Sequence, residues 1–257
     1  MKLFDTHAHL LDERFDEDRE KLIASLPDKG VAHIMECACM EKDLVRVPEL
    51  VKRYPGYISG AVGVHPHYAA EFPAAKVTLV EAALGNEGIL AVGEVGLDYH
   101  YDFAPRDVQR ELFAAQAELA AEKRLPLLIH DREAHGDTMD VLKALKGRGF
   151  GIMHCFSGSY EMAKELIDLG YHIGIGGSAT FKNNRRMKEM LPKLPPERIV
   201  LETDCPYMTP EPFRGERNDP SLTAVTCHHI ADLIGMDADA LAEQCHENAC
   251  RLFGLAE

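Results

Sequence analysis

Tryptophan is absent from this 257-residue chain, and no apolar run approaches the roughly 18 residues that a membrane-spanning helix needs. The first residues, Met1 to Asp5, lead into no apolar signal-peptide core. The seven cysteines are odd in number and lack the regular spacing of a disulfide framework, so we expect reduced thiols. These absences predict a soluble, cytoplasmic protein without a membrane partner.

Basic side chains are also scarce. The chain has 28 Lys and Arg against 42 Asp and Glu, which gives a formal net charge of −14. This balance argues against a broad basic surface that captures a nucleic-acid backbone regardless of its sequence. The glycine-containing segments match neither the G-x-G-x-x-G nor the Walker A pattern, which argues against a nucleotide cofactor. What the chain does contain is 13 histidines beside its many carboxylates, a composition that suggests a metal site.

Short apolar runs alternate with amphipathic stretches along the whole chain. We expect strands over Lys2–His9, Val31–Cys37, Tyr57–Val64, Ile89–Val95, Pro126–His130, Gly149–Cys155, Tyr171–Gly176 and Arg198–Thr203. Helical spacing follows Pro105 and Ser159 and begins again at Leu222, and a further helix is expected over Ala240–Phe253. This alternation predicts a (β/α)8 barrel, one domain over residues 1–257 with an extra C-terminal helix. A doubly wound open sheet is the competing architecture.

Polar residues end six of the expected strands. They occur in Asp5-Thr6-His7-Ala8-His9, His65-Pro66, Gly93-Glu94-Val95-Gly96-Leu97-Asp98, His130-Asp131, His154-Cys155 and Glu202-Thr203-Asp204. In a barrel the carboxyl ends of all strands meet on one rim, where the chemistry lies. Taken singly, the His7-x-His9 pair could be a surface accident, and His130 and His154 hydrogen-bonded core residues. Glu94 could be a helix-capping or ion-paired carboxylate, and Asp204 a helix cap. Their joint occurrence at successive strand ends favours a metal site.

The candidate ligands form two groups that Glu94 could bridge: His7, His9 and Asp204 in one, and His130 and His154 in the other. Imidazole combined with carboxylate suits Zn²⁺, Mn²⁺ or similar ions, whereas all-oxygen sites suit Mg²⁺ or Ca²⁺. Two such ions about 3.5–4 Å apart polarise a phosphoryl or carbonyl oxygen and activate a bridging water. The pattern therefore predicts hydrolysis without a covalent enzyme intermediate. Asp204 could also orient the water and take its proton.

The ordered motifs resemble those of the TatD-type metal-dependent hydrolases, which belong to the amidohydrolase superfamily. The resemblance runs from residue 5 to the Asn248-Ala249-Cys250-Arg251-Leu252-Phe253 tail. It rests on Asp5-Thr6-His7-Ala8-His9-Leu10, Gly63-Val64-His65-Pro66, Gly93-Glu94-Val95-Gly96-Leu97-Asp98, Ile129-His130, His154-Cys155-Phe156-Ser157-Gly158 and Glu202-Thr203-Asp204-Cys205-Pro206.

The resemblance implies a distorted TIM barrel with two divalent ions, which could be Zn, Mn or Mg. It assigns His7, His9 and Asp204 to the first metal, Glu94 to the bridge, and His130 and His154 to the second metal. The phosphotriesterase branch of the superfamily bridges its metals with a carboxylated Lys. No Lys ends an expected strand here, so Glu94 has to supply the bridge. Members are generally described as deoxyribonucleases, some of them 3′→5′ exonucleases on single strands.

Basic and aromatic loop residues are the candidates for contacts with the substrate. Loops after the seventh and eighth strands are the usual phosphate-binding place in this fold, and the first of them is the most basic segment of the chain. The candidates are His65, Arg132, Arg185, Arg186 and Arg217, although the basic segment also reads as a solvated helix start. Tyr99-His100-Tyr101 is the best candidate for stacking on bases; Phe72, Phe103 and Phe181 are further loop aromatics, and most of these aromatics are expected to be packing residues.

Three functions compete. The leading one is a metal-dependent deoxyribonuclease that acts on single-stranded DNA ends, with Asp204 and Glu94 as catalytic residues and no obligate protein partner. The same two metals could instead hydrolyse a small ester, lactone or amide, or an aminoacyl-tRNA ester. The third is a catalytically silent barrel that serves as a binding module, which the complete ligand set argues against.

Overall fold

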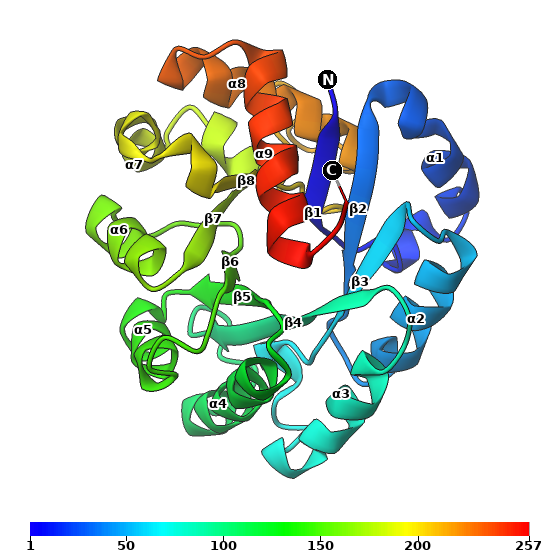
Figure 1. The fold of residues 1–257 in the computed structure, drawn as a ribbon, viewed down its shortest axis with the longest axis vertical. Helices are drawn as coiled ribbons and strands as arrows, with labels where there is room; N and C mark the ends of the chain where they lie inside the picture. Colours follow the sequence, from blue (N-terminus) through cyan, green and yellow to red (C-terminus); the bar gives the residue numbers. More distant parts are fainter. Residues whose placement is uncertain (257) are drawn as a thin grey trace. The chain divides into compact units, whose positions relative to one another are not determined.

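The computed structural model describes residues 1–256, in which eight strands form one sheet in the order β1 to β8. The strands are β1 Leu3–Ala8, β2 Val31–Cys37, β3 Ile58–Val62, β4 Ile89–Asp98, β5 Leu127–Arg132, β6 Gly151–Met153, β7 Tyr171–Ile175 and β8 Ile199–Leu201 (Figure 1). The pairs β1–β2, β3–β4, β4–β5, β5–β6 and β7–β8 are parallel.

Helices follow the strands along the chain. They are α1 Arg19–Ser25, α2 Asp43–Arg53, α3 Val77–Leu84, α4 Arg106–Lys123, α5 His135–Ala144, α6 Tyr160–Asp168, α7 Arg185–Met190, α8 Thr223–Ile234 and α9 Ala238–Phe253. Parallel strands in chain order, each followed by a helix, confirm the (β/α)8 barrel class. The expected C-terminal helix is α9, which begins two residues earlier than predicted because the Asp237 side chain caps it by accepting from the N–H of Ala240 at 3.0 Å.

The chain divides into two compact units, which we describe separately. The first unit comprises residues 1–36, 155–164 and 173–257. Within it β1 meets β8 and the chain that follows it: Thr6 Oγ1 donates to the carbonyl of Leu201 at 3.0 Å, and Ala8 forms a parallel bridge with Cys205. Helix α9 packs across β1 and β8, where Phe253 lies 5.7 Å from Phe4 between ring centroids (Figure 1).

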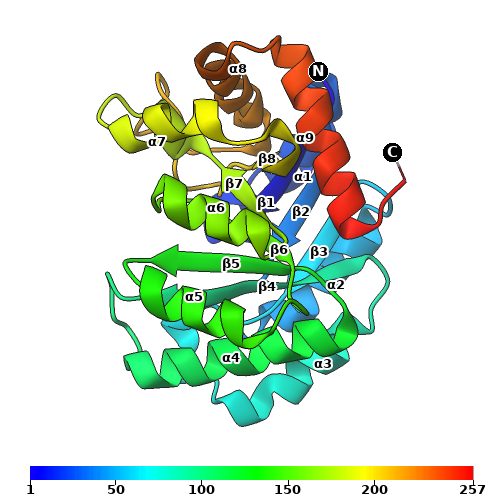
Figure 2. The ribbon, with the colours of Figure 1, turned by 60° about the vertical axis from the view of Figure 1, so that its left-hand side comes forward.

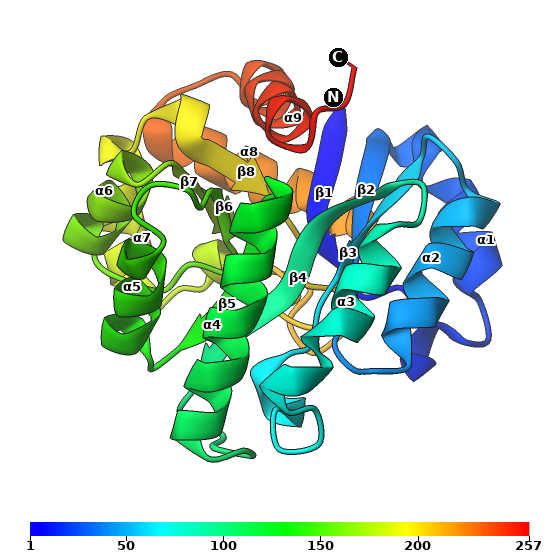
Figure 3. The same cartoon turned by 60° about the horizontal axis from the view of Figure 1, so that its bottom comes forward.

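The second unit comprises residues 37–154 and 165–172. Helices α4 and α5 run beside β4 and β5 (Figure 2), and α2 and α3 flank β3 (Figure 3). Two buried glutamines tie α4 to the strands. The Gln116 amide exchanges hydrogen bonds with the backbone of Val64, and the Gln109 amide does the same with Asp98, at 2.9 and 3.1 Å. Helix α4 therefore fixes the end of β4.

The expected strand positions hold, whereas the ends of most strands differ. Strand β4 continues three residues beyond the predicted Val95, so that Asp98 belongs to the strand. Strands β6 and β8 are each only three residues long, shorter than predicted. In the part of the chain that the structure describes, no helix has the length and apolarity to span a membrane.

Candidate functional site

In the first unit, His7, His9 and Asp204 converge; we call these three residues the Asp204 cluster. Their potential ligand atoms all lie within 4.8 Å of one another, and Nε2 of His9 is 3.4 Å from Oδ1 of Asp204. His7 is fully buried and His9 nearly so. Two buried imidazoles and one partly exposed carboxylate are a donor set that suits Zn²⁺ or Mn²⁺.

Backbone hydrogen bonds hold the Asp204 cluster together. The N–H of Asp204 donates to the carbonyl of His7 at 2.9 Å, and the N–H of His9 donates to the carbonyl of Cys205 at 2.9 Å. Asp204 itself has a φ of 58°, in the left-handed region that Asp tolerates better than most residues. The polypeptide therefore brings Asp204 beside the two histidines from the far end of the sequence.

The buried carboxyl group of Asp5 supports the Asp204 cluster through contacts with Thr203. It accepts from Oγ1 of Thr203 at 2.6 Å and from the N–H of Thr203 at 2.9 Å. Burial raises the pKa of Asp5 to about 7, although the bonds from Thr203 oppose the shift. Asp5 was not a predicted site residue, and its two hydrogen bonds to Thr203, the residue before Asp204, make it a positioning group.

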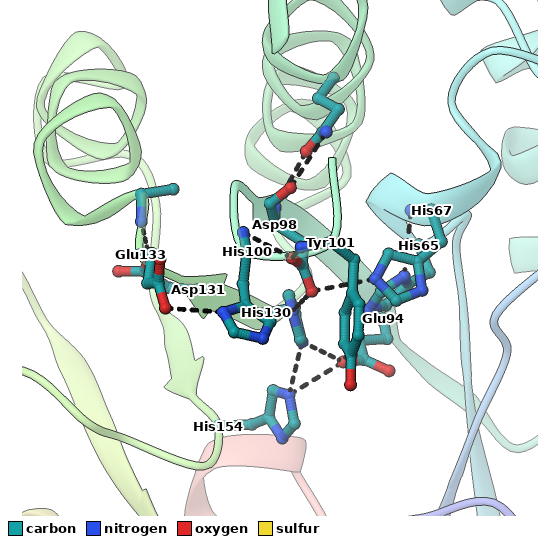
Figure 4. Close-up of polar contacts among 12 residues, drawn as sticks. His65, His67, Glu94, Asp98, His100, Tyr101, His130, Asp131, Glu133 and His154 are labelled. Atoms are coloured by element: carbon teal, nitrogen blue, oxygen red, sulfur yellow. Dashed lines mark hydrogen bonds and ion pairs between the residues drawn. The ribbon is translucent and has the colours of Figure 1, made fainter. Parts of the chain in front are cut away.

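In the second unit, Glu94, His130 and His154 converge; we call these the Glu94 cluster (Figure 4). Oε1 of Glu94 lies 2.8 Å from Nε2 of His154 and 3.0 Å from Nδ1 of His130, and the two nitrogens are 3.3 Å apart. His65 approaches the same oxygen with its Nε2 at 3.6 Å.

The spacing of the Glu94 cluster fits a metal ion. Ligands about 2.0–2.1 Å from a tetrahedral Zn²⁺ are roughly 3.3 Å from each other, close to the three separations found here. Glu94 and His154 are almost completely buried, and a charged carboxylate at such a position needs cationic or hydrogen-bonding partners. The donor set and its spacing therefore suit a divalent ion in the second unit as well.

Glycine at position 96 allows His130 to reach this position. Gly96 pairs with His130 across β4 and β5 and has a φ of +142°. A Cβ at this residue would lie 1.9 Å from the carbonyl oxygen of His130, so any side chain would push the two strands apart.

Asp98 extends the Glu94 cluster outward. Its Oδ2 accepts from Nε2 of His130 at 3.1 Å and from Nε2 of His67 at 2.9 Å (Figure 4). Holding Nε2 turns the other ring nitrogen, Nδ1, toward Glu94 and His154, as carboxylates beside metal-binding histidines commonly do. Neither Asp98 nor His67 was a predicted site residue. The available signal was their spacing, since Asp98 ends the Glu94 motif and His67 follows His65 by two.

The contacts of Asp98 control two ionisations. Burial would raise the pKa of Asp98, but the hydrogen bonds from His130 and His67 outweigh it and hold that pKa well below its usual range. Burial would lower the pKa of His130, but Asp98 and Glu94 overcome it and raise that pKa to about 9. A divalent ion at Nδ1 of His130 therefore competes with a proton for this nitrogen.

The predicted substrate residues lie in different surroundings. Arg132 is exposed and sits 4.7 Å from the ring centroid of Tyr101. Arg185 and Arg186 are exposed at the start of α7, where the side chain of Asn184 caps the helix, and Arg186 donates to the carbonyl of Ser157 at 3.0 Å. The expected basic loop is thus largely the first turn of a helix.

His65 and Arg217, the other two predicted substrate residues, both form hydrogen bonds within the protein. The Nδ1 of His65 accepts from the N–H of His67 at 3.2 Å, which aims Nε2 at Glu94. The guanidinium of Arg217 forms an ion pair with Asp18 at 2.7 Å and donates to the carbonyl of Arg14 at 2.6 Å. These bonds occupy much of the Arg217 donor capacity.

The chain matches the family model described as TatD related DNase over residues 4–254. The chain belongs to the TatD family. It is 39% identical over 252 residues to the "Uncharacterized metal-dependent hydrolase YabD" of Bacillus subtilis, covering 98% of both chains. It is 33% identical over 261 residues to the "3'-5' ssDNA/RNA exonuclease TatD" of Pantoea ananatis, covering 98% of this chain and 100% of that one.

Solved structures agree with this assignment to the TatD family. The crystal structure of YJJV, a TatD homologue from Escherichia coli, has a TM-score of 0.92 at 30% identity and covers 99% of this chain and 98% of its own. The phosphotriesterase homology protein of Escherichia coli, at 16% identity and a TM-score of 0.67, shares the fold, with 98% of both chains covered. The protein is therefore a metal-dependent hydrolase of the TatD family.

Proposed function

We propose that this TatD-family protein is a metal-dependent phosphodiesterase that removes nucleotides from the 3′ end of single-stranded DNA. The observation that carries the proposal is the Glu94 cluster, whose three ligand atoms are 2.8–3.3 Å apart. The relative from Pantoea ananatis is named as an exonuclease on both single-stranded DNA and RNA. RNA is therefore a second nucleic acid to test.

Each cluster is proposed to hold one divalent ion, giving two per chain. The donor types favour Zn²⁺ or Mn²⁺, and Mg²⁺ is the third ion to test. Ions bound at such sites polarise a phosphoryl oxygen and lower the pKa of water toward neutrality. The assignment of Glu94 as a ligand shared by both ions stays a prediction.

Asp204 and Asp98 have separate roles in the proposed reaction. Asp204 orients the attacking water and accepts its proton, because its carboxylate is held next to two histidines by the backbone bonds to β1. Asp98 keeps His130 in the orientation that presents Nδ1 to Glu94. Single-domain organisation and a cytoplasmic location also stay predictions.

The decisive experiment follows the length of a 5′-labelled single-stranded oligonucleotide during incubation with the purified protein and Mg²⁺ or Mn²⁺. We expect stepwise shortening from the 3′ end that stops when a chelator is added, and no shortening by Glu94→Gln. A matched control, Glu118→Gln, removes a carboxylate that pairs with Arg148 on the surface and should leave the rate unchanged.

The relative from Bacillus subtilis, which is named only as a metal-dependent hydrolase, keeps a second function open. The same ligand set activates water for attack on carbonyl groups. If the oligonucleotide stays intact while a panel of esters, lactones, amides and aminoacyl-tRNA is turned over, the nuclease proposal is wrong and the ester hydrolase takes its place.

A further inference from the structure

Two exposed aromatic rings lie close to the Glu94 cluster. Tyr101 and Phe103, in the connection between β4 and α4, are 48% and 65% exposed. Their rings are stacked, with centroids 5.3 Å apart and planes only 15° from parallel. Most exposed aromatics on a protein surface are single, so a parallel pair with this much open area is a feature that needs an explanation.

The aromatic pair is connected to the Glu94 cluster through His67. The ring of His67 meets Tyr101 edge-on at 5.4 Å and Phe103 edge-on at 4.8 Å. The same ring bonds to Asp98, which bonds to His130. The carboxylate of Asp98 also accepts from the N–H of Tyr101 at 2.9 Å, so the start of this loop is anchored to the cluster (Figure 4).

One guanidinium beside the rings is available to an anionic ligand. Asp102 pairs with Arg106 at 2.7 Å. Glu133 and Asp131 lie 2.7 and 2.8 Å from the imidazoles of His100 and His135, which cancel a carboxylate charge only when they are protonated. Arg132, by contrast, makes no ion pair with any of residues 1–256 and lies over the ring of Tyr101 at 4.7 Å. A guanidinium beside a ring can meet a phosphate while the ring meets a base.

We propose that Tyr101 and Phe103 form a stacking platform for the nucleobases at the end of a single strand, and that Arg132 contacts the phosphate that links these nucleotides. The inference rests on the proposed nuclease function and adds to it the group that is recognised, an unpaired base. Bases of any sequence stack on aromatic rings, so the platform selects single strands over duplexes without reading sequence.

Tyr99, which lies two residues before Tyr101, differs from the two residues of the proposed platform in its contacts. The hydroxyl of Tyr99 donates to Asp137 at 2.5 Å, and Arg106 covers its ring at 4.4 Å. Both tyrosine rings have a guanidinium over them, so exposure is what distinguishes the two. Tyr99 is half-buried and its hydroxyl is bonded to Asp137, whereas Tyr101 is 48% exposed and is therefore the more accessible to a base.

The test compares two single-stranded substrates in metal-loaded protein: an oligothymidylate, and the same strand with abasic residues at its 3′ end. We expect the wild type to prefer the intact strand by about tenfold or more in kcat/KM. The double variant Tyr101→Ser/Phe103→Ser should lose this preference and cleave both strands at the abasic rate. Leu79→Ser removes an exposed apolar side chain from α3 and should keep the wild-type preference.

Two outcomes overturn the inference while leaving the nuclease function standing: equal cleavage of both strands by the wild type, or an unchanged preference in the double variant. If neither strand is cleaved, the proposed nuclease function is wrong, and the existence of the stacking platform is then tested by binding of the oligonucleotide alone. In that case the fluorescence of a 3′-terminal 2-aminopurine should be quenched by the wild-type protein and not by the double variant. Equal fluorescence with both proteins would overturn the platform.

Discussion

The Asp204 cluster and the Glu94 cluster contain the same kinds of ligand but are held together by different contacts. In the Asp204 cluster, backbone bonds between β1 and the chain after β8 place the ligands, and a buried Asp5–Thr203 pair supports them. In the Glu94 cluster, paired strands bring the ligands together and side chains then orient one another: Asp98 holds His130, which meets Glu94 and His154. The Asp204 cluster should therefore tolerate changes to neighbouring side chains better than the Glu94 cluster does.

Removal of Glu94 gives the largest expected effect. Glu94→Ala takes away the anionic ligand that faces both His130 and His154. We expect hydrolysis to fall by at least about a thousandfold, because an active-site ion contributes several kcal/mol to the transition state. Metal analysis of the purified variant should show the loss of the ion bound in this cluster. Activity within about tenfold of the wild type would remove Glu94 from the mechanism.

The second largest effect is expected for Asp204→Asn. The backbone bond from this residue to His7 is retained, so the variant should fold normally. Loss of the group that accepts the proton should lower kcat by about 10²–10⁴-fold. Circular dichroism and metal analysis provide the controls, since the Glu94 cluster should keep its ion. Wild-type kcat in this variant would contradict the role assigned to Asp204.

Asp98→Asn tests the dependence of the Glu94 cluster on its neighbours. The substitution keeps the shape of the side chain but weakens its hold on Nε2 of His130. We expect metal affinity or activity to fall by about 10–100-fold. Asp131→Asn is the matched control, because Asp131 also bonds a histidine, His135, at the end of β5. Equal effects of the two substitutions would show that Asp98 has no special part in the cluster.

The smallest effect is expected for Arg185→Ala/Arg186→Ala on α7. Both guanidinium groups are exposed, so we expect a rise in KM for oligonucleotides of several-fold, with metal content unchanged. The control is Arg148→Ala, which breaks a surface pair with Glu118 and should leave KM unchanged. If the double variant has the KM of the wild type, phosphate recognition does not involve this helix.

The fold was predictable because the strand signal is strong where strands are buried on both faces. Strand β2 has the predicted bounds, whereas β4 continues to Asp98. The extension was not visible in the sequence because Gly96 and the polar Asp98 weaken the strand pattern. They belong to the strand since Gly96 lets it approach β5 closely and Gln109 pairs with the backbone of Asp98.

The types of ligand residue in the site were predictable from the sequence, but the residues that orient those ligands were not. His7, His9 and Asp204 come together as a group, as do Glu94, His130 and His154, while their roles as ligands stay predictions. Asp98, His67 and Asp5 were missed because a carboxylate or imidazole that orients another residue has no spacing rule of its own. Their roles depend on which side chains three-dimensional packing places beside them.

Metal stoichiometry is the most direct test of the assignment of one ion to each cluster. Equilibrium dialysis of the metal-depleted protein against Mn²⁺, followed by metal analysis, should show two ions per chain in the wild type. One ion should remain in His9→Gln and one in His130→Gln, because each substitution removes an imidazole from only one cluster. Wild-type protein that binds no ion, or variants that both retain two ions, would contradict the assignment of one ion to each cluster.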